Sequence, residues 1–288
     1  MYCPSTELAV RAFQSARGLR GDGICDEHTW LALVEASWSL GDRALYLTSP
    51  NLRGDDVAEL QTRLARLGFD PGRVDGIFGP RTGRAVDDFQ TNCGLRPDGV
   101  CGPETVRAIL RVSGQTGDGP GIAAVREREA LRSGPVSLAD CRIVLGQFGG
   151  LSGLVRPLAR DLRLRGASVM TLDEPDAVAQ ALAANHFGAH VYLGFESSDE
   201  PATVVHFYRV PTFESLGGRT LAEGLVAQLD VVPHLRATTD GMRLPVLRET
   251  RMPAVLVTVG PLRQALDAAP LVVDAALHAI EVWISRAR

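Results

Sequence analysis

Residues 57–110 are the most informative part of this chain about how its N-terminal part folds: VAELQTRLARLGFDPGRVDGIFGPRTGRAVDDFQTNCGLRPDGVCGPETVRAIL. Apolar residues recur there at helical spacing, and glycines and Asp-Gly pairs interrupt them. The pattern therefore predicts three short helices joined by two tight turns. In chain order these are a helix over 57–67, an Asp-Gly turn at 75–76, a helix over 82–93, an Asp-Gly turn at 98–99 and a helix over 106–110.

Several residues of this stretch have ordinary structural interpretations. Thr82 and Thr105 stand where helices are expected to begin, so we predict that each of them caps a helix. Ala85, Val86 and Phe89 share one face of the middle helix. We expect them to form a core with the apolar residues of the first helix.

The stretch resembles the three-helix peptidoglycan-binding module found beside many bacterial cell-wall hydrolases, and the similarity covers the whole module. The resemblance implies glycan binding, for which the candidate side chains are Arg73, Asp75, Arg81 and Gln90. A solvated or structural role competes with glycan binding at each of these four positions.

An incomplete copy of the module precedes the complete one. Residues 9–33 match 85–110, so that Phe13 corresponds to Phe89 and Gln14 to Gln90. The first copy has no counterpart of residues 57–79, and we therefore expect an N-terminal segment to be missing from this sequence. The predicted divisions are a partial repeat over 1–46, a complete module over 47–112, a linker over 113–137 and a larger domain over 138–288.

Composition excludes some classes of function. A formal net charge of -4 and a pI near 5.9 give no electrostatic basis for binding nucleic acid. The five cysteines form no CxxC pair, which favours neither a disulfide framework nor a zinc knuckle. Cys25 and Cys101 occupy matching positions of the repeat and are predicted to be core thiols. With no export signal and no apolar run long enough to span a bilayer, we expect a cytoplasmic protein.

From residue 138 onward short apolar runs alternate with helical patterns. This alternation predicts an α/β domain whose mixed sheet is covered by helices. The expected strands are 141–146, 167–172, 189–195, 203–209 and 253–260, and the expected helices are 151–165, 176–185, 213–229 and 270–288. In the linker, residues 122–133 are predicted to form a short charged helix.

The order of these elements, and several local phrases, resemble the zinc-dependent N-acetylmuramoyl-L-alanine amidases. In that family a His after the first strand, a Glu opening the next helix and a His ending a later strand bind zinc, and a Glu on the last strand is the catalytic base. The first of these positions falls on Phe148 or Gly149, depending on a one-residue gap. The later His position falls on Glu196 and the base on Thr258, while the Glu that opens a helix has no visible match.

The substitutions imply that the zinc site is lost, because a catalytic zinc needs three protein ligands and an open position for water. We therefore expect no metal cofactor and no catalytic residue. A narrower resemblance, over nearly the whole chain, is to an actinobacterial group of amidase-like proteins. That group implies a cytoplasmic regulator of peptidoglycan synthesis, whose partners are peptidoglycan or its precursors and the UDP-N-acetylglucosamine enolpyruvyl transferase. An active amidase and a glycan-binding protein without catalysis stay open as alternatives.

Overall fold

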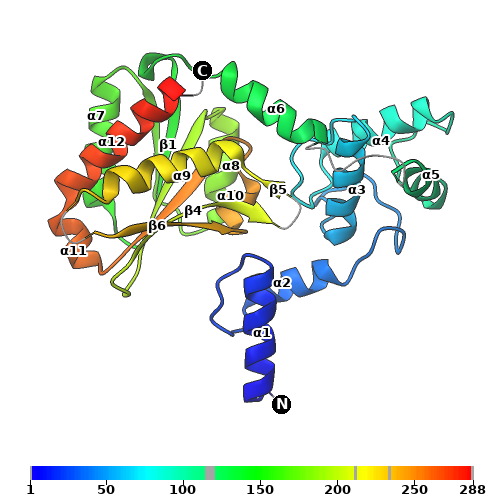
Figure 1. The fold of residues 1–288 in the computed structure, drawn as a ribbon, viewed down its shortest axis with the longest axis horizontal. Helices are drawn as coiled ribbons and strands as arrows, with labels where there is room; N and C mark the ends of the chain where they lie inside the picture. Colours follow the sequence, from blue (N-terminus) through cyan, green and yellow to red (C-terminus); the bar gives the residue numbers. More distant parts are fainter. Residues whose placement is uncertain (1, 114–120, 211–212, 233–234, 287–288) are drawn as a thin grey trace. The chain divides into compact units, whose positions relative to one another are not determined.

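The computed structural model describes residues 2–113, 121–210, 213–232 and 235–286. The chain divides into two compact units (Figure 1). The first comprises Met1–Glu127 with Pro211–Phe213, and the second comprises Arg128–Val210 with Glu214–Arg288. None of the helices in the described part of the chain has the length and apolarity that a bilayer crossing requires.

The first unit is helical. Its helices are α1 (Pro4–Ala16), α2 (Glu27–Ala36), α3 (Asp55–Arg66), α4 (Pro80–Asn92) and α5 (Pro103–Ser113). The three helices predicted over 57–110 correspond to α3, α4 and α5, so that prediction is confirmed. The chain leaves α3 at Gly68, whose φ of 91° is a conformation that glycine adopts without strain.

The core of the complete module is formed by the apolar faces of α3, α4 and α5. Val57, Leu60 and Leu64 of α3 are fully buried against Val86 and Phe89 of α4. Cys101 is also buried, and burial raises the pKa of its thiol to about 12. Its repeat counterpart Cys25 is exposed, so the prediction of a core thiol is correct for Cys101 and wrong for Cys25.

Helix α6 (Gly121–Arg132) follows in the predicted linker, close to the expected range, and residues 114–120 of that linker lie outside the described residues. The second unit is an α/β sandwich. Its strands are β1 (Arg142–Phe148), β2 (Ser168–Leu172), β3 (Val191–Ser197), β4 (Thr203–Val210), β5 (Phe213–Glu214), β6 (Ala237–Met242) and β7 (Ala254–Val259). Its helices are the 3-10 turn η1 (Leu138–Asp140), α7 (Ser152–Leu164), α8 (Ala177–Phe187), α9 (Leu216–Leu229), α10 (Pro245–Glu249), α11 (Leu262–Asp267) and α12 (Ala269–Arg286).

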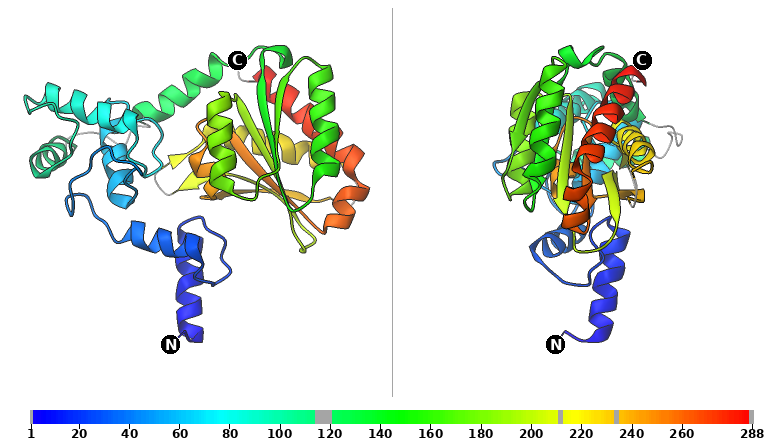
Figure 2. Two further views of the ribbon diagram at one scale, coloured as in Figure 1. Left: turned by 180° about the vertical axis from the view of Figure 1, so that it is seen from behind. Right: turned by 90° about the vertical axis from the view of Figure 1, so that its left-hand side faces the viewer.

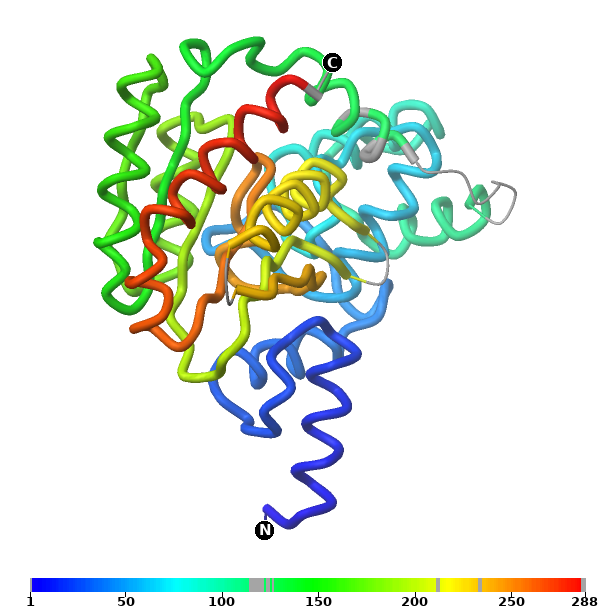
Figure 3. The backbone as a smooth tube through the Cα atoms, turned by 60° about the vertical axis from the view of Figure 1, so that its left-hand side comes forward, coloured from blue at the N-terminus to red at the C-terminus, as the bar shows by residue number. Residues whose placement is uncertain are grey.

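The seven strands of the described residues form one mixed sheet with the order β2-β1-β3-β7-β4-β5, and β6 pairs with β4. Strands β2, β1, β3 and β7 are mutually parallel, whereas β4 runs antiparallel to β7. Helices cover both faces, as predicted (Figure 2). Helices α7, α9 and α12 pack side by side on one face, and α8 and α10 lie on the other (Figure 3).

The large hydrophobic core lies between the sheet and the layer of α7, α9 and α12. Ile143, Leu145, Leu193 and Val255 point into it, and each is fully buried. Alternate residues of the same strands face α8 and α10, because successive side chains of a strand point to opposite faces. Residues 148, 196 and 258 belong to that second set.

One predicted boundary needs correction, and one strand was missed. The helix expected over 213–229 begins at Leu216, because Phe213–Glu214 form the short strand β5 and the Ser215 side chain caps the helix by accepting from the Gly218 amide. Strand β6 was not predicted. Its sequence, ATTDGM, has an exposed polar middle that gives no apolar run.

Candidate functional site

Three residues singled out in the sequence meet at the carboxyl ends of three neighbouring parallel strands. Phe148 of β1 is the register partner of Glu196 of β3, and Glu196 is the register partner of Thr258 of β7. The Thr258 hydroxyl donates to Glu196 Oε2 at 3.3 Å. Ligand sites of open α/β sheets lie beyond the carboxyl ends of the strands. We call Phe148, Glu196 and Thr258 the strand-end trio.

The sequence left Phe148 and Gly149 as alternatives for the first position. Phe148 is the one in register, at the end of β1 and half-buried. Gly149 has a φ of 89°, and a Cβ atom built on it would lie 2.2 Å from Ser197 Oγ. A side chain at Gly149 would therefore be strained and would displace Ser197.

The strand-end trio offers one carboxylate, one hydroxyl and one phenyl ring. A catalytic zinc takes nitrogen, sulfur or carboxylate ligands from three residues and keeps a fourth position for water. Glu196 is the only member of the trio that provides such a ligand. Within the described ranges, no group of three or more His, Cys, Asp or Glu residues could hold a metal ion. The residues that the structure places here thus do not fit the zinc of the amidases.

His190 and His206 lie at other positions of the sheet. His190 is at the amino end of β3, where its Nδ1 accepts from the Arg142 amide at 3.1 Å, and burial lowers the pKa of its ring. His206 is on β4, where its register partner is Leu256. Neither His190 nor His206 is paired across the strands with a residue of the strand-end trio.

Beneath the trio lies a buried polar network that the sequence did not reveal. Tyr192 donates to Gln180 Oε1 at 2.8 Å, and Gln180 Nε2 donates to the carbonyl of Gln147 at 3.0 Å and to that of Glu174 at 2.6 Å. Burial raises the pKa of the Tyr192 hydroxyl, which is therefore a neutral donor. The network fits only because Gly146 has no side chain: a Cβ there would lie 2.1 Å from Gln180 Oε1.

In the helical unit, Gln90 is buried and holds the Asp98-Gly99 turn. Its Nε2 donates to Asp98 Oδ1 at 2.9 Å, to the Val100 carbonyl at 3.0 Å and to Thr105 Oγ1 at 3.0 Å. Its Oε1 accepts from the Asp98 amide at 3.1 Å and from the Gly99 amide at 3.0 Å. We call this arrangement of Gln, Asp-Gly and Thr the glutamine knot.

The glutamine knot occurs three times in the described residues. Gln61 makes the same bonds to Asp75, Ile77 and Thr82, and Gln14 makes them to Asp22, Ile24 and Thr29. Each knot ties one helix to the start of the next, because the glutamine belongs to the first helix and the threonine to the second. Gln, Asp-Gly and Thr recur at the same spacing in each repeat, and this pattern could have predicted that the glutamine holds the Asp-Gly turn.

The knot corrects the prediction that Thr82 and Thr105 cap helices. Thr82 is the third residue of α4, whose N-cap is Gly79 without a side-chain cap, and Thr105 is the third residue of α5. Both hydroxyls are buried and accept from a knot glutamine instead.

The four glycan-binding candidates have different surroundings. Gln90 is 2% exposed and Asp75 accepts within a knot, so both side chains are held by the fold. Arg73 is half-buried. The side chain of Arg81 is 57% exposed, with a long ion pair of 3.8 Å to Asp70. Arg81 is therefore the candidate that presents most of its side chain to solvent.

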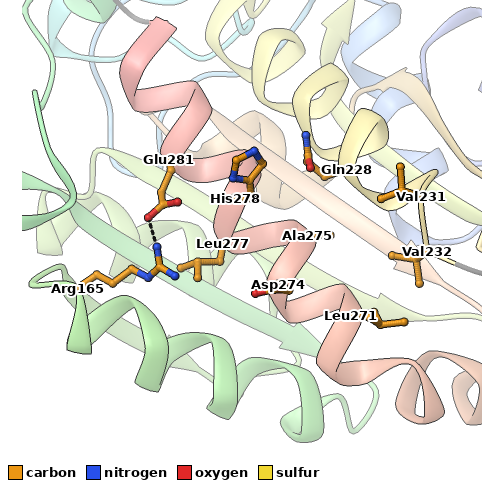
Figure 4. Close-up of a pocket in the computed structure, with 10 residues that line it drawn as sticks. All are labelled: Arg165, Gln228, Val231, Val232, Leu271, Asp274, Ala275, Leu277, His278 and Glu281. Atoms are coloured by element: carbon orange, nitrogen blue, oxygen red, sulfur yellow. Dashed lines mark hydrogen bonds and ion pairs between the residues drawn. The ribbon is translucent and has the colours of Figure 1, made fainter.

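A shallow pocket of about 290 Å³ lies away from the strand ends, on the outer surface of the layer of α9 and α12 (Figure 4). Its floor is apolar, with Val232 and Leu277, and its rim carries Asp274 and His278. The Arg165 guanidinium and the Glu281 carboxylate of the rim form an ion pair with each other. Arg165 and Glu281 neutralise each other, and we assign no site to this pocket.

Comparison with known proteins identifies the class to which these features belong. The family described as "Putative peptidoglycan binding domain" matches residues 1–33 and 53–109. Over 94% of its length the chain is similar to a member of the N-acetylmuramoyl-L-alanine amidase family, at 35% identity and across 75% of that protein. The chain belongs to the N-acetylmuramoyl-L-alanine amidase family, and its first unit is a peptidoglycan-binding region.

That relative is N-acetylmuramoyl-L-alanine amidase CwlM of Mycobacterium tuberculosis, aligned over 305 residues. A second relative, amidase CwlL of Bacillus licheniformis, is 32% identical over 117 residues, which are 34% of this chain and 32% of that protein. Among solved structures, amidase AmiC2 of Nostoc punctiforme matches 49% of this chain and 94% of its own at 18% identity and a TM-score of 0.39. Amidase Ami1 of Mycobacterium abscessus matches 50% of this chain and 99% of its own at 13% identity and a TM-score of 0.40.

Proposed function

We propose that this chain is a catalytically inactive member of the amidase family and acts in the cytoplasm as a regulator of peptidoglycan synthesis. The observation that supports the proposal is the composition of the strand-end trio. The positions at which the family resemblance implies zinc ligands and a catalytic base hold Phe148, Glu196 and Thr258, aligned in register on three strands.

The chemistry of amide hydrolysis by this family explains why these substitutions matter. A zinc-bound water has a pKa near 7, and a carboxylate beside it accepts its proton. Phe148 cannot bind a metal, and a threonine hydroxyl is not a base at neutral pH. Glu196 could supply a single oxygen, but its carboxylate already accepts a hydrogen bond from Thr258. No hydrolytic step can be assigned to this trio.

The proposed partners follow from the family and from the helical unit. We propose that the first unit binds peptidoglycan or its precursors, with Arg81 as the candidate contact that is open to solvent. We further propose that the α/β unit binds a protein of wall synthesis. The resemblance described above implies that this protein is the UDP-N-acetylglucosamine enolpyruvyl transferase.

Zinc binding provides the decisive test, measured by elemental analysis of the purified chain and by calorimetric titration with zinc. We expect well below one equivalent of tightly bound metal and no change in the Glu196→Gln variant. One tight equivalent that Glu196→Gln abolishes would contradict the proposal. Digestion of peptidoglycan provides the second readout, with an active amidase as positive control. New N-terminal L-alanine amines would show that the chain is an active enzyme.

Partner binding is measured separately, with the purified transferase immobilised and the full chain in solution. Saturable binding without zinc is the expected result. Absence of binding to the transferase and to soluble precursors would remove the regulatory part of the proposal while leaving the question of catalysis to the zinc experiment.

A further inference from the structure

An arginine and a histidine stand side by side at the amino ends of β1 and β3. Arg142 is the first residue of β1, and His190 directly precedes β3. The pairing of the two strands extends to them, because Ile143 is the register partner of Val191 and the His190 amide donates to the Arg142 carbonyl at 2.8 Å. Both side chains therefore lie on the same face of the sheet. This end of the strands is opposite to the end that carries the strand-end trio.

The guanidinium of Arg142 is held by the main chain and carries a charge that no ion pair offsets. Its Nε donates to the Gly188 carbonyl at 2.7 Å, where α8 ends. Gly188 has no side chain, and a Cβ built there would lie 3.4 Å from Arg142 Nη2. Among the described residues, no carboxylate forms an ion pair with Arg142. Asp140, two residues earlier, accepts instead from the Ser137 hydroxyl at 2.7 Å.

The imidazole of His190 turns a second donor toward this guanidinium. Its Nδ1 accepts from the Arg142 amide at 3.1 Å. Burial, and after it the charge of Arg142, lowers the pKa of the ring, so the imidazole is neutral near pH 7 and carries its one proton on Nε2. Nε2 lies 3.2 Å from Arg142 Nη2. Two N–H groups thus meet, and neither can accept from the other. The other tautomer would set Nδ1–H against the Arg142 amide, so one acceptor is missing in either state.

A second arginine lies at the same edge of the sheet. The Arg251 amide donates to Asn185 Oδ1 at 2.9 Å, near the end of α8. Two residues further along the chain, the Pro253 carbonyl accepts from the Tyr192 amide of β3 at 3.0 Å. Arg251 is exposed. The amino ends of these strands therefore bring two positive charges and a histidine donor to one edge that is open to solvent.

We propose that Arg142 and His190 bind a phosphate group. An oxygen atom placed between Arg142 Nη2 and His190 Nε2 accepts from both and removes the conflict between the two donors. The remaining Nη hydrogens of the guanidinium suit a second oxygen, because its planar fork matches the geometry of a phosphate. A phosphate monoester carries close to two negative charges at neutral pH, and Arg142 and Arg251 supply two positive ones. The site goes beyond the proposed function and holds whether or not the chain binds zinc.

The test titrates the full chain with inorganic phosphate at low ionic strength, followed by calorimetry and by the NMR signals of the histidine ring nitrogens. We expect saturable binding that shifts the His190 signals. Arg142→Gln should weaken binding at least about tenfold, because it removes charge-assisted hydrogen bonds. Arg160→Gln is the matched control: it removes the same charge from an exposed position of α7, where Arg160 pairs with Asp161 at 2.8 Å, and it should bind as the wild type does.

A second variant and a second source of phosphate sharpen the test. His190→Asn removes the Nε2 donor, keeps Arg142 and should also weaken binding. Sedimentation with phosphatidylcholine vesicles that contain phosphatidic acid separates a lipid headgroup from a soluble phosphate. Binding to either source that Arg142→Gln removes supports the site and identifies the source.

Three results would overturn the proposal, with circular dichroism showing that the variants are folded. The first is the absence of saturable binding both to inorganic phosphate and to the vesicles. The second is an equal loss of binding in Arg142→Gln and Arg160→Gln, which would show non-specific attraction between charges. The third is binding of acetate as tight as that of phosphate, which would assign the site to carboxylates.

Discussion

Asp98 shows at the residue scale how the glutamine knot is held. Its carboxylate accepts from the Val100 amide at 3.0 Å and from Gln90 Nε2 at 2.9 Å. These hydrogen bonds favour the ionised form and lower the pKa of Asp98, with the Val100 amide as the larger cause. The turn between α4 and α5 is therefore stabilised by the ionised Asp98 carboxylate, which becomes protonated at acidic pH.

The sign of the resulting pH dependence follows from the lowered pKa. The bonds of Asp98 stabilise the folded module above the ordinary carboxyl pKa of about 3.9, and this contribution is lost as the pH falls through the lower folded-state pKa. The free energy of unfolding of the wild-type chain, measured by urea denaturation, should fall as the pH is lowered below about 4. We expect this fall to be smaller in the Asp98→Asn variant. Asp88→Asn, at an exposed position of α4, changes the charge equally and is the control. Identical acid profiles of the two variants would contradict this assignment.

At the scale of the elements, β1 depends on a position without a side chain. A Cβ at Gly146 would lie 2.1 Å from Gln180 Oε1 and 2.2 Å from the Tyr192 hydroxyl. Gly224 lies inside α9, and a Cβ there would meet no atom within 4 Å. We therefore expect a change to alanine to lower the free energy of unfolding at Gly146 and to raise it at Gly224.

Gly146→Ala should destabilise the α/β unit by about 2–3 kcal/mol, since it overpacks the sheet and breaks the bond between Tyr192 and Gln180. Gly224→Ala should stabilise it by about 0.5–1 kcal/mol, because alanine loses less backbone entropy in a helix. Urea denaturation followed by circular dichroism measures both. A neutral Gly146→Ala variant would show that Gln180 and Tyr192 do not form the close network described here.

The elements also show where sequence reasoning succeeds and where it stops. Strands β1, β3 and β7 were predicted because burial on both faces of the sheet leaves long apolar runs. Helices α7, α8 and α12 were predicted from their helical sequence patterns. Strand β6 was missed because its middle is polar and exposed. The register of the strand-end trio could not follow from periodicity, because it requires the strand order that places β3 between β1 and β7. The family resemblance pointed to these residues, and the sheet brought them together.

On the scale of the whole molecule, the sequence predicted a helical repeat region and an α/β domain, and the structure has both. The role of Gln90 was missed, because a glutamine on an amphipathic helix is compatible with solvent until the Asp-Gly turn folds over it. The exposure of Cys25 was missed for a related reason. The repeat predicts equivalent positions, whereas Cys101 is buried by the core cluster that includes α3, and Cys25 lies outside that cluster.

We expect the first unit to bind peptidoglycan and the second unit to bind the transferase, and a truncated chain can test this. The large core contains residues from Cys141 to Ile284, with Leu131 packed against it, and all of them belong to the second unit. A chain of residues 128–288 should therefore unfold cooperatively. It should keep its binding to the transferase but lose sedimentation with insoluble peptidoglycan, which the full chain should retain. If the truncated chain sediments with peptidoglycan as well as the full chain does, glycan binding belongs to the α/β unit. If the truncated chain is folded but binds neither the transferase nor peptidoglycan, the helical repeats carry all binding.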